Sequence, residues 1–439
     1  MNPCRRRISG LVLFSFLSCQ FLAGAGPTPS PQLTQDAYVW NRAWTPPVQR
    51  SVEAHSGAFK TLIPLAAEVS WKKTAPQVVR IPLNTPVLKK VGRPIGLALR
   101  AGPWPGPFET NQPPCKLLMG LAQSIIEEAR AANLQVSELQ LDFDCAQARL
   151  AGYRKWVEAL RNAIAPVPLV ITALPSWLDE PEFAKLASAA DGFVLQVHSL
   201  ERPRGFNAPF TLCDPAAARR AVKRAGQLQI PFRVALPSYG YDIAFDAADK
   251  FIGLAAEGTL KPWPKNARVR EVMSDPVQIA GLVQEWSTNR PPAMKGIAWY
   301  RLPVDNDILC WRWQTLSAII ALRLPRESFR AEARRVEAGL VEISLINEGD
   351  LDISSRLTLE TRWSRDGGIR LLAGDGLRGF EKVDAGTSTA SFQTKAGPCH
   401  LRAGDKLVVG WLRFSKDREV QVEVRRIKPE GGAANRPEK

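Results

Sequence analysis

The chain has few of the residues from which metal and redox sites are built. Its 439 residues include only 7 cysteines and 3 histidines, and no two cysteines form a CxxC pair. An aspartate pair with one histidine supplies too few ligands at metal-site spacing. The sequence therefore predicts no metal and no cofactor.

Long apolar runs are also scarce. Residues 8–22 form one, with three arginines before it and three small residues after it. This pattern predicts a signal peptide over residues 1–25, so that the mature protein begins near Gly26 and is periplasmic or secreted. The alternative is lipid attachment at Cys19, which would tether the protein to the envelope. No later run approaches the roughly 20 apolar residues that cross a bilayer.

Acidic residues are fewer than basic ones. The net charge is +15, and loss of the signal peptide removes three arginines from it. A basic surface favours anionic partners such as acidic glycans. The basic residues are scattered instead of forming one stripe, and the chain is exported, so nucleic acid is not an expected partner.

Export also allows disulfides among the five cysteines that remain. Cys115 is expected in the loop after the third strand and Cys145 at the end of the fourth. One prediction is therefore a bridge between them, and the other is five buried thiols.

Strand-like and helix-like segments alternate over residues 36–325. Apolar periodicity of 3.6 indicates helices at 116–132, 148–163 and 214–228. The strand candidates are 36–44, 59–71, 93–102, 136–144, 167–175, 192–199, 232–241 and 296–303. Their number, and the lack of a GxGxxG segment after any of them, favour a closed (β/α)8 TIM-type barrel over an open doubly wound sheet.

The remaining segments have different patterns of apolar and turn residues. After residue 325 the helical patterns stop, and alternating apolar residues separated by Gly, Asp and Asn turns predict a small antiparallel β-sandwich over 326–430. Residues 26–35 are Pro-rich and predict a linker, and 431–439 predict a disordered tail.

Two aspartates end the segment VSELQLDFD. Side chains two apart on a strand point the same way, so Asp142 and Asp144 should share one face. The carboxyl ends of barrel strands form the active-site mouth, which predicts this pair as the catalytic residues. The structural alternative is that they cap the next helix or bind loop amides.

Aromatic, polar and charged side chains end several other strands, and together they suit a ring-shaped polar ligand such as a sugar. Each type also has an ordinary structural role in a barrel, so the prediction depends on their convergence at one end. The predicted substrate-binding residues are Trp40, Arg42, Glu68, Arg100, Gln196, His198, Tyr239, Asp242, Trp299 and Arg301.

Four motifs in order carry a family resemblance. They are LQLDFD, FVLQVHS, ALPSYGYD and GIAWYRLP. They resemble an exported bacterial barrel family, the domain of unknown function numbered 3142, and more distantly the chitinase-type glycoside hydrolases. The resemblance extends over roughly residues 36–325 and implies a protein that acts on or binds a carbohydrate.

The chitinase-type motif DxxDxDxE is incomplete in this chain. When Asp142 and Asp144 are aligned on its last two aspartates, Leu139 replaces the first Asp and Ala146 replaces the Glu that protonates the leaving group. The resemblance also matches Gln196 and His198 with the Gln-x-Tyr of strand six, and Trp299 with the tryptophan of strand eight.

Two hypotheses follow from this departure. In the first, the protein is a glycoside hydrolase in which Asp144 is the acid or nucleophile and Asp142 tunes it, with Glu68 or Asp242 as a second carboxylate. In the second, it is a noncatalytic glycan-binding or envelope-associated protein that has lost the acid.

Overall fold

The computed structural model describes residues 33–427 except 73–74, 257–261 and 365. The predicted signal peptide, Cys19, most of the predicted linker and the tail 431–439 lie outside the described residues.

Eight parallel strands close into a barrel. Pairing of the last strand with the first completes the ring, and the first also pairs with the second. The strands are β1 (Thr34–Val39), β2 (Thr61–Lys72), β4 (Ile95–Ala101), β5 (Val136–Phe143), β6 (Leu169–Ala173), β7 (Phe193–Gln196), β8 (Phe232–Pro237) and β12 (Met294–Tyr300). The predicted (β/α)8 barrel is confirmed.

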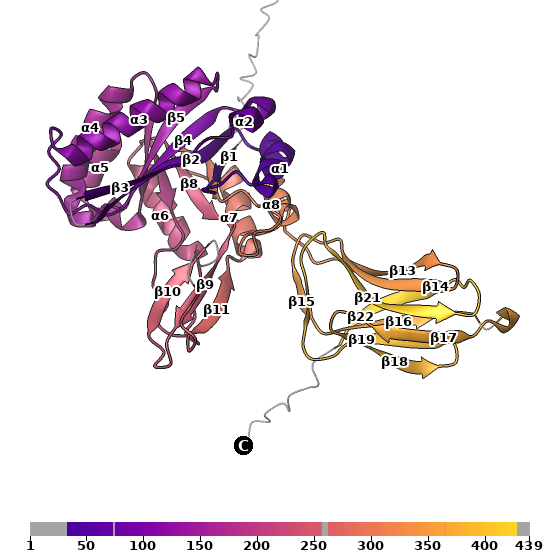
Figure 1. Ribbon diagram of the computed structural model, residues 1–439. Coiled ribbons are helices and arrows are strands. Elements are labelled where there is room, and N and C mark those ends of the chain that lie inside the picture. The colour runs from indigo at the N-terminus through magenta and orange to yellow at the C-terminus, as the bar shows by residue number, and fades with distance from the viewer. Residues whose placement is uncertain (1–32, 73–74, 257–261, 365, 428–439) are drawn as a thin grey trace, which may run out of the picture. The chain divides into compact units, whose positions relative to one another are not determined.

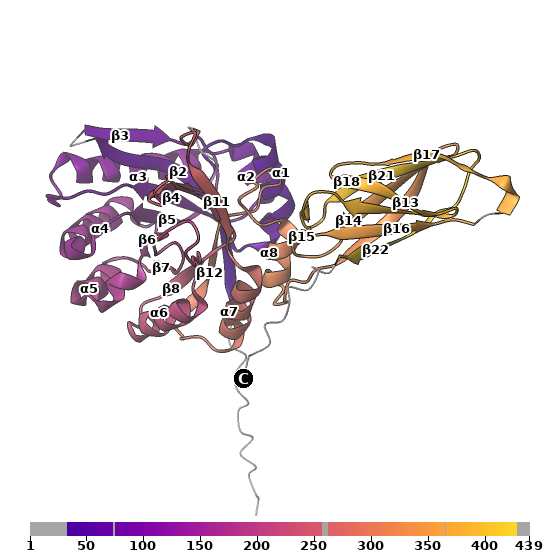
Figure 2. The ribbon, with the colours of Figure 1, turned by 90° about the horizontal axis from the view of Figure 1, so that it is seen from below.

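A helix follows each barrel strand, directly or after an insertion, and the helices lie around the outside of the strands (Figure 1 and Figure 2). They are α1 (Pro46–His55), α2 (Thr85–Val91), α3 (Pro113–Ala131), α4 (Leu150–Ile164), α5 (Pro181–Ala189), α6 (Pro215–Gln227), α7 (Pro276–Thr288) and α8 (Trp313–Ile320). Six of them have proline in the first turn, where its fixed φ favours helix initiation. Within the described residues, no helix is both long and apolar enough to cross a membrane.

The barrel strands are apolar on both faces, and the two faces pack into separate cores. Leu139, Leu141 and Phe143 of β5 join the large core between strands and helices. Tyr38 and Ala298, with other side chains of the opposite parity, form a second cluster inside the barrel. Strand parity therefore decides which side chains reach the interior.

Two insertions extend the barrel. Strand β3 (Ala75–Arg80) pairs antiparallel with the end of β2. Between β8 and α7 lies a separate antiparallel sheet of β9 (Gly240–Phe245), β10 (Phe251–Ala255) and β11 (Arg268–Met273). The strand predicted over 232–241 is thus two strands, because β8 ends at Pro237. A Cβ on Gly240 would lie 2.6 Å from the Val272 carbonyl oxygen, so the close approach of β9 to β11 requires glycine there.

Antiparallel strands follow the barrel and form the predicted sandwich. One sheet contains β13 (Phe329–Glu337), β14 (Leu340–Asn347), β21 (Lys406–Phe414) and β17 (Leu371–Gly376). The other contains β18 (Phe380–Gly386), β19 (Thr389–Thr394), β16 (Leu357–Arg362) and β22 (Gln421–Arg426), and β15 (Ile353–Ser355) pairs with β20 (Cys399–Leu401). Ile343 and Leu412 of the first sheet share one core with Leu359 and Phe392 of the second.

The cysteines are free thiols. All five described cysteines are buried and unpaired, so the predicted Cys115–Cys145 bridge is wrong and the alternative of buried thiols holds. Helix α3 begins at Pro113 and carries Cys115 in its first turn, where the thiol packs in the core. The Cys145 thiol donates instead to the Ala146 carbonyl oxygen at 3.5 Å.

Candidate functional site

A cavity of about 320 Å³ lies at the carboxyl ends of the barrel strands. This is the end at which barrel enzymes hold their substrates. Of the residues predicted from the sequence, the cavity brings together Trp40, Arg100, Asp142, Asp144, Gln196, His198 and Tyr239. They come from five strands or strand ends, so the cavity depends on closure of the barrel.

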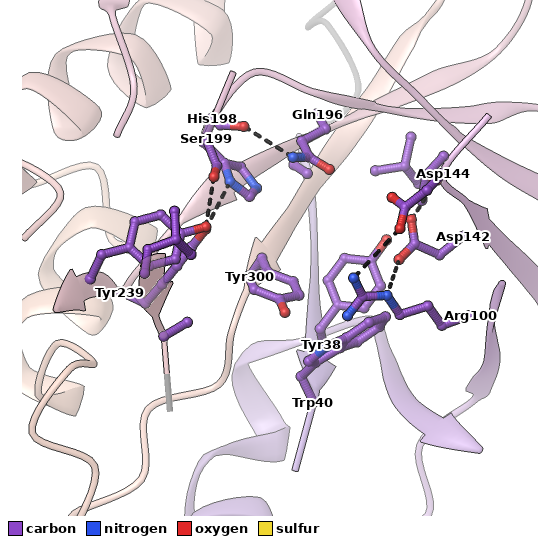
Figure 3. A pocket seen from close by; sticks show the side chains of 16 residues that line it. Tyr38, Trp40, Arg100, Asp142, Asp144, Gln196, His198, Ser199, Tyr239 and Tyr300 are labelled. Carbon is purple, nitrogen blue, oxygen red and sulfur yellow. Dashed lines mark hydrogen bonds and ion pairs between the residues drawn. The ribbon is translucent and has the colours of Figure 1, made fainter. Parts of the chain in front are cut away.

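The acidic side of the cavity is the end of β5. Asp142 and Asp144 both face the cavity (Figure 3), as strand alternation predicts. Thr172 on β6 donates its hydroxyl to Asp142 at 2.7 Å. The Arg100 guanidinium lies 3.9 Å from Asp142 and 3.7 Å from Asp144.

The two carboxyls have different environments. The Asp142 side chain is 24% exposed, whereas that of Asp144 is 50% exposed. Burial raises the pKa of Asp142 above its ordinary value, and the hydrogen bond from Thr172 and the charge of Arg100 offset only part of this rise. Asp142 therefore holds a proton to higher pH than a solvated aspartate, and Asp144 is the carboxyl open to a ligand.

Glu68 and Arg42 lie next to Arg100, outside the lining of the cavity. Arg42 donates two hydrogen bonds to Glu68, at 2.5 and 3.0 Å, and Arg100 lies 3.9 Å from the same carboxylate. Neither Glu68 nor Arg42 lines the cavity. Their geometry fits a role in holding Arg100 in place.

The opposite side of the cavity carries hydroxyl groups around a histidine. Figure 3 shows Gln196, His198, Ser199 and Tyr239 across the cavity from the carboxylates. The Tyr239 hydroxyl lies 3.4 Å from His198 Nδ1 and 2.9 Å from the Tyr241 hydroxyl, which is 2.6 Å from Ser199 Oγ. Burial lowers the pKa of His198 to about 3, so its imidazole is neutral at physiological pH.

Ser199 has an unusual backbone conformation. Its φ is 58°, in the left-handed region that non-glycine residues seldom adopt. The cost of such a conformation is about 1 kcal/mol or more, and residues of this kind cluster at functional sites.

Three aromatic rings lie between the two sides. Tyr300 packs edge to face on Trp40 and Tyr38, with ring centroids 5.2 and 5.7 Å apart, and Tyr38 contacts Trp40 in the same way at 5.5 Å. Rings of this kind offer apolar area to the C–H face of a sugar.

Trp299 and Arg301 do not line the cavity, because they have the opposite parity to Tyr300. The Trp299 side chain is in the core between strands and helices, and its indole N–H donates to Gln35 Oε1 at 2.7 Å. The Arg301 side chain is buried, where it pairs with Asp307 and donates to the Ala256 carbonyl oxygen at 2.8 Å.

Asp242 also lies outside the cavity. It is on β9 of the inserted sheet, opposite Glu271 of β11. It therefore faces none of the carboxyls of the cavity, and neither Asp242 nor Glu68 supplies a second carboxylate to its lining.

Several lining residues were not predicted from the sequence. They are Tyr38, Thr172, Val194, Ser199, Ala235, Leu254, Ala256 and Tyr300. Parity could have identified Tyr38, since it lies two residues before the predicted Trp40. Leu254 and Ala256 come from β10 and the residue that follows it, for which the sequence gives no such signal.

The described residues contain no group of three or more His, Cys, Asp or Glu side chains that could hold a metal ion. The polar groups of the described lining residues include two carboxyls, a neutral imidazole, the Gln196 amide, hydroxyls and one guanidinium.

Residues 115–305 match a family model described as Domain of unknown function (DUF3142). The model covers the barrel from α3 to the segment after β12, and all four of the motifs recognised in the sequence lie within it. No curated protein matches the chain.

Solved structures with a similar fold include several glycoside hydrolases. A chitinase from Chromobacterium violaceum is 12% identical, with a TM-score of 0.44, over 66% of this chain and 98% of its own. A spore cortex-lytic enzyme from Bacillus megaterium is 14% identical, with a TM-score of 0.47, over 68% and 75%. A chitinase from Bacteroides thetaiotaomicron is 14% identical, with a TM-score of 0.45, over 67% and 96%.

Proposed function

We propose that the protein is an exported glycoside-hydrolase-like protein that binds a carbohydrate in the cavity at the barrel mouth and hydrolyses it. The observation that carries this proposal is the pairing of two carboxyls on one side of the cavity with aromatic rings and hydroxyls on the rest. Export is proposed from the sequence of residues 1–25, either as a free periplasmic or secreted protein or as a lipoprotein anchored at Cys19.

The roles of the residues follow from their exposure and environment. Asp144 reaches solvent and donates the proton to the glycosidic oxygen, or attacks the sugar carbon. Asp142 lies one pleat deeper, and its charge sets the proton affinity of Asp144. Trp40 and Tyr300 contact the apolar face of the sugar ring, and the neutral His198 with Tyr239 hydrogen-bonds its hydroxyls.

The charge inside the cavity differs from that of the whole protein. Among the described residues that line it, Arg100 is the one with a guanidinium, and it faces two carboxyls. The cavity itself therefore favours a neutral or cationic sugar. Acidic glycans, which the net charge of +15 favours, would bind elsewhere on the surface.

One observation favours the alternative of a noncatalytic glycan-binding protein. Asp142 and Asp144 are the only carboxyls among the described lining residues, and both come from the end of β5. Glycoside hydrolysis usually requires two carboxyls that flank the bond. The exposed residue 146, at the position of the acid in the chitinase-type motif, is alanine.

A glycan panel with two variants separates the two functions. The mature protein is mixed with neutral, N-acetylated and acidic oligosaccharides, and binding and hydrolysis are measured. For a hydrolase, Asp144→Asn keeps affinity and lowers turnover by about 100-fold or more. The control is Asp305→Asn, which changes an exposed carboxyl outside the cavity. Binding without hydrolysis in the wild type would favour the noncatalytic protein, and no binding at all would refute both.

A further inference from the structure

A chain of hydrogen bonds runs through the barrel interior below the cavity. It begins at Tyr38, which lines the cavity, and ends at Asp36 on the same strand, through partners on β5 and β8. All five members are buried or have side chains that are at most 14% exposed. Buried polar networks of this kind are costly unless every member is satisfied.

The direction of each bond can be read from the chemistry of its partners. The Arg233 guanidinium has donors only, and it donates to Glu138 Oε1 at 2.7 Å and to Asp36 Oδ2 at 2.8 Å. Glu138 Oε1 also accepts from the Gln140 amide nitrogen at 2.6 Å. Since that nitrogen faces Glu138, the amide oxygen of Gln140 faces the other way.

The Tyr38 hydroxyl contacts the amide oxygen of Gln140. Its hydroxyl lies 2.6 Å from Gln140 Oε1, which is an acceptor, so the hydroxyl must donate its only proton there. The far end of the chain is held as well, because Asp36 accepts from the Thr61 amide at 3.0 Å. Burial raises the pKa of Tyr38, which keeps the proton on the hydroxyl.

We infer that Gln140, which Glu138 and Arg233 hold in place, accepts the only proton of the Tyr38 hydroxyl. Towards the cavity, the Tyr38 oxygen can then act only as a hydrogen-bond acceptor. The sugar group seated at Tyr38 is therefore a hydrogen-bond donor, either a hydroxyl or an N–H group, and an ether or carbonyl oxygen is disfavoured there. The statement about the sugar rests on the proposed function, whereas the direction of the Tyr38 bond does not.

The direction of the bond can be tested without a ligand. The chain has five tyrosines, so labelling their ζ carbons with ¹³C gives five NMR signals, and Tyr38→Phe identifies one. In mixed H₂O and D₂O, a hydroxyl proton that exchanges slowly splits its ζ-carbon signal in two. We expect the Tyr38 signal to be split in the wild type and single in Gln140→Met. The matched control, Gln123→Met, changes an exposed glutamine on α3 and should leave the splitting unchanged.

A single Tyr38 line in the wild type, or a splitting that persists in folded Gln140→Met, would overturn the inference. Glu138→Met is a second variant in case Gln140→Met does not fold. It removes the oxygen that accepts from the Gln140 amide nitrogen, and it should also collapse the splitting.

The sugar preference is tested with a bound glycan from the panel and analogues in which single hydroxyls are replaced by fluorine. At one position the replacement should weaken binding to the wild type by about 10-fold, the effect of one hydrogen bond. In Tyr38→Phe, replacement at that position should have no effect. Equal losses in both proteins at every position would refute the donor preference. If no glycan binds, the proposed function fails, and the NMR result still decides the direction of the Tyr38 bond.

Discussion

Asp142 and Asp144 are two residues apart, yet the structure gives them different access to solvent. Burial acts on Asp142, and solvent reaches Asp144. The sequence identified the pair because alternation along β5 is unambiguous, with Leu139, Leu141 and Phe143 on the other face. Their environments could not be predicted, because Thr172 and Arg100 come from other strands.

A change at Asp142 should move the pH dependence of hydrolysis. Asp142→Asn removes a negative charge beside Asp144 and so lowers the pKa of Asp144. If Asp144 is the acid, the alkaline limb of the kcat/KM profile should shift to lower pH, because the proton is lost earlier. A pH–rate profile of both proteins measures the shift. A limb that stays in place would show that Asp142 does not tune its neighbour.

His198 should make stability depend on pH. Burial lowers its pKa from 6.5 to about 3, so between these values the unfolded chain binds a proton that the folded protein does not. The free energy of unfolding should therefore fall as pH decreases from about 6.5 towards 3, by up to about 1.4 kcal/mol per pH unit from this group. The raised pKa of Asp36 and of Asp142 acts in the opposite sense, since stability from a raised carboxyl is lost as pH rises.

Urea unfolding between about pH 4 and pH 7 checks this contribution, because an exposed histidine titrates in this range. His198→Gln should have a flatter profile than the wild type, whatever its absolute stability. His400→Gln changes an exposed histidine on β20 and is the control. Parallel profiles for the wild type and His198→Gln would show that His198 is not buried as a neutral group.

At the scale of single strands, parity separates what could be predicted from what could not. All eight barrel strands were recognised, since each is an apolar run between turn residues. On β12, however, Trp299, Tyr300 and Arg301 are all suited to a binding site, and a parallel strand that is apolar on both faces does not reveal which of them points inward. The inserted sheet was missed because β9 follows β8 after only two residues.

The parity of β12 gives a direct pair of variants. Tyr300→Ala should weaken glycan affinity by about 10-fold, the value of a lost aromatic contact, and leave the fold intact. Trp299→Phe should keep affinity and reduce the free energy of unfolding by about 1 kcal/mol, because it loses the hydrogen bond to Gln35. Titration calorimetry and urea unfolding measure the two effects. If Trp299→Phe weakened glycan affinity and Tyr300→Ala did not, Trp299 instead of Tyr300 would lie in the cavity.

Closure of the barrel depends on a close approach between β12 and β1. A Cβ on Gly296 would lie 2.6 Å from the Thr34 carbonyl oxygen. Gly296→Ala should therefore lower the free energy of unfolding by about 1–3 kcal/mol, the usual cost of overpacking. Gly120→Ala on α3 is the matched control, since nothing lies within 4 Å of its Cβ. It should stabilise the protein by about 0.4–1 kcal/mol. If Gly296→Ala did not destabilise the protein relative to Gly120→Ala, the close approach of β12 to β1 would be contradicted.

At the scale of the whole molecule, the order of a closed barrel followed by an antiparallel sandwich was predictable, because helical patterns alternate with strands up to residue 325 and stop there. The relation between the cavity and the net charge was not. Basic residues outnumber acidic ones in the whole chain, whereas the described residues that line the cavity include two carboxyls and one guanidinium. A net charge alone therefore gives no guide to the ligand of the cavity.

Export is a prediction for the whole chain that intact-protein mass spectrometry can check. Expressed from its full sequence in a bacterium, the protein recovered outside the cytoplasm should begin near Gly26. A mass that includes a diacylglycerol group on Cys19 would establish the lipoprotein alternative, and a full-length protein in the cytoplasm would refute export.

A carbohydrate in the cavity, with its scissile bond at Asp144, would be visible in a crystal structure of the Asp144→Asn protein soaked with an oligosaccharide that binds in the panel. We expect a sugar ring against Tyr300 and Trp40, with a glycosidic oxygen about 3 Å from the side chain of residue 144, the reach of a general acid. A sugar bound only outside the barrel mouth, with the cavity unoccupied, would contradict it.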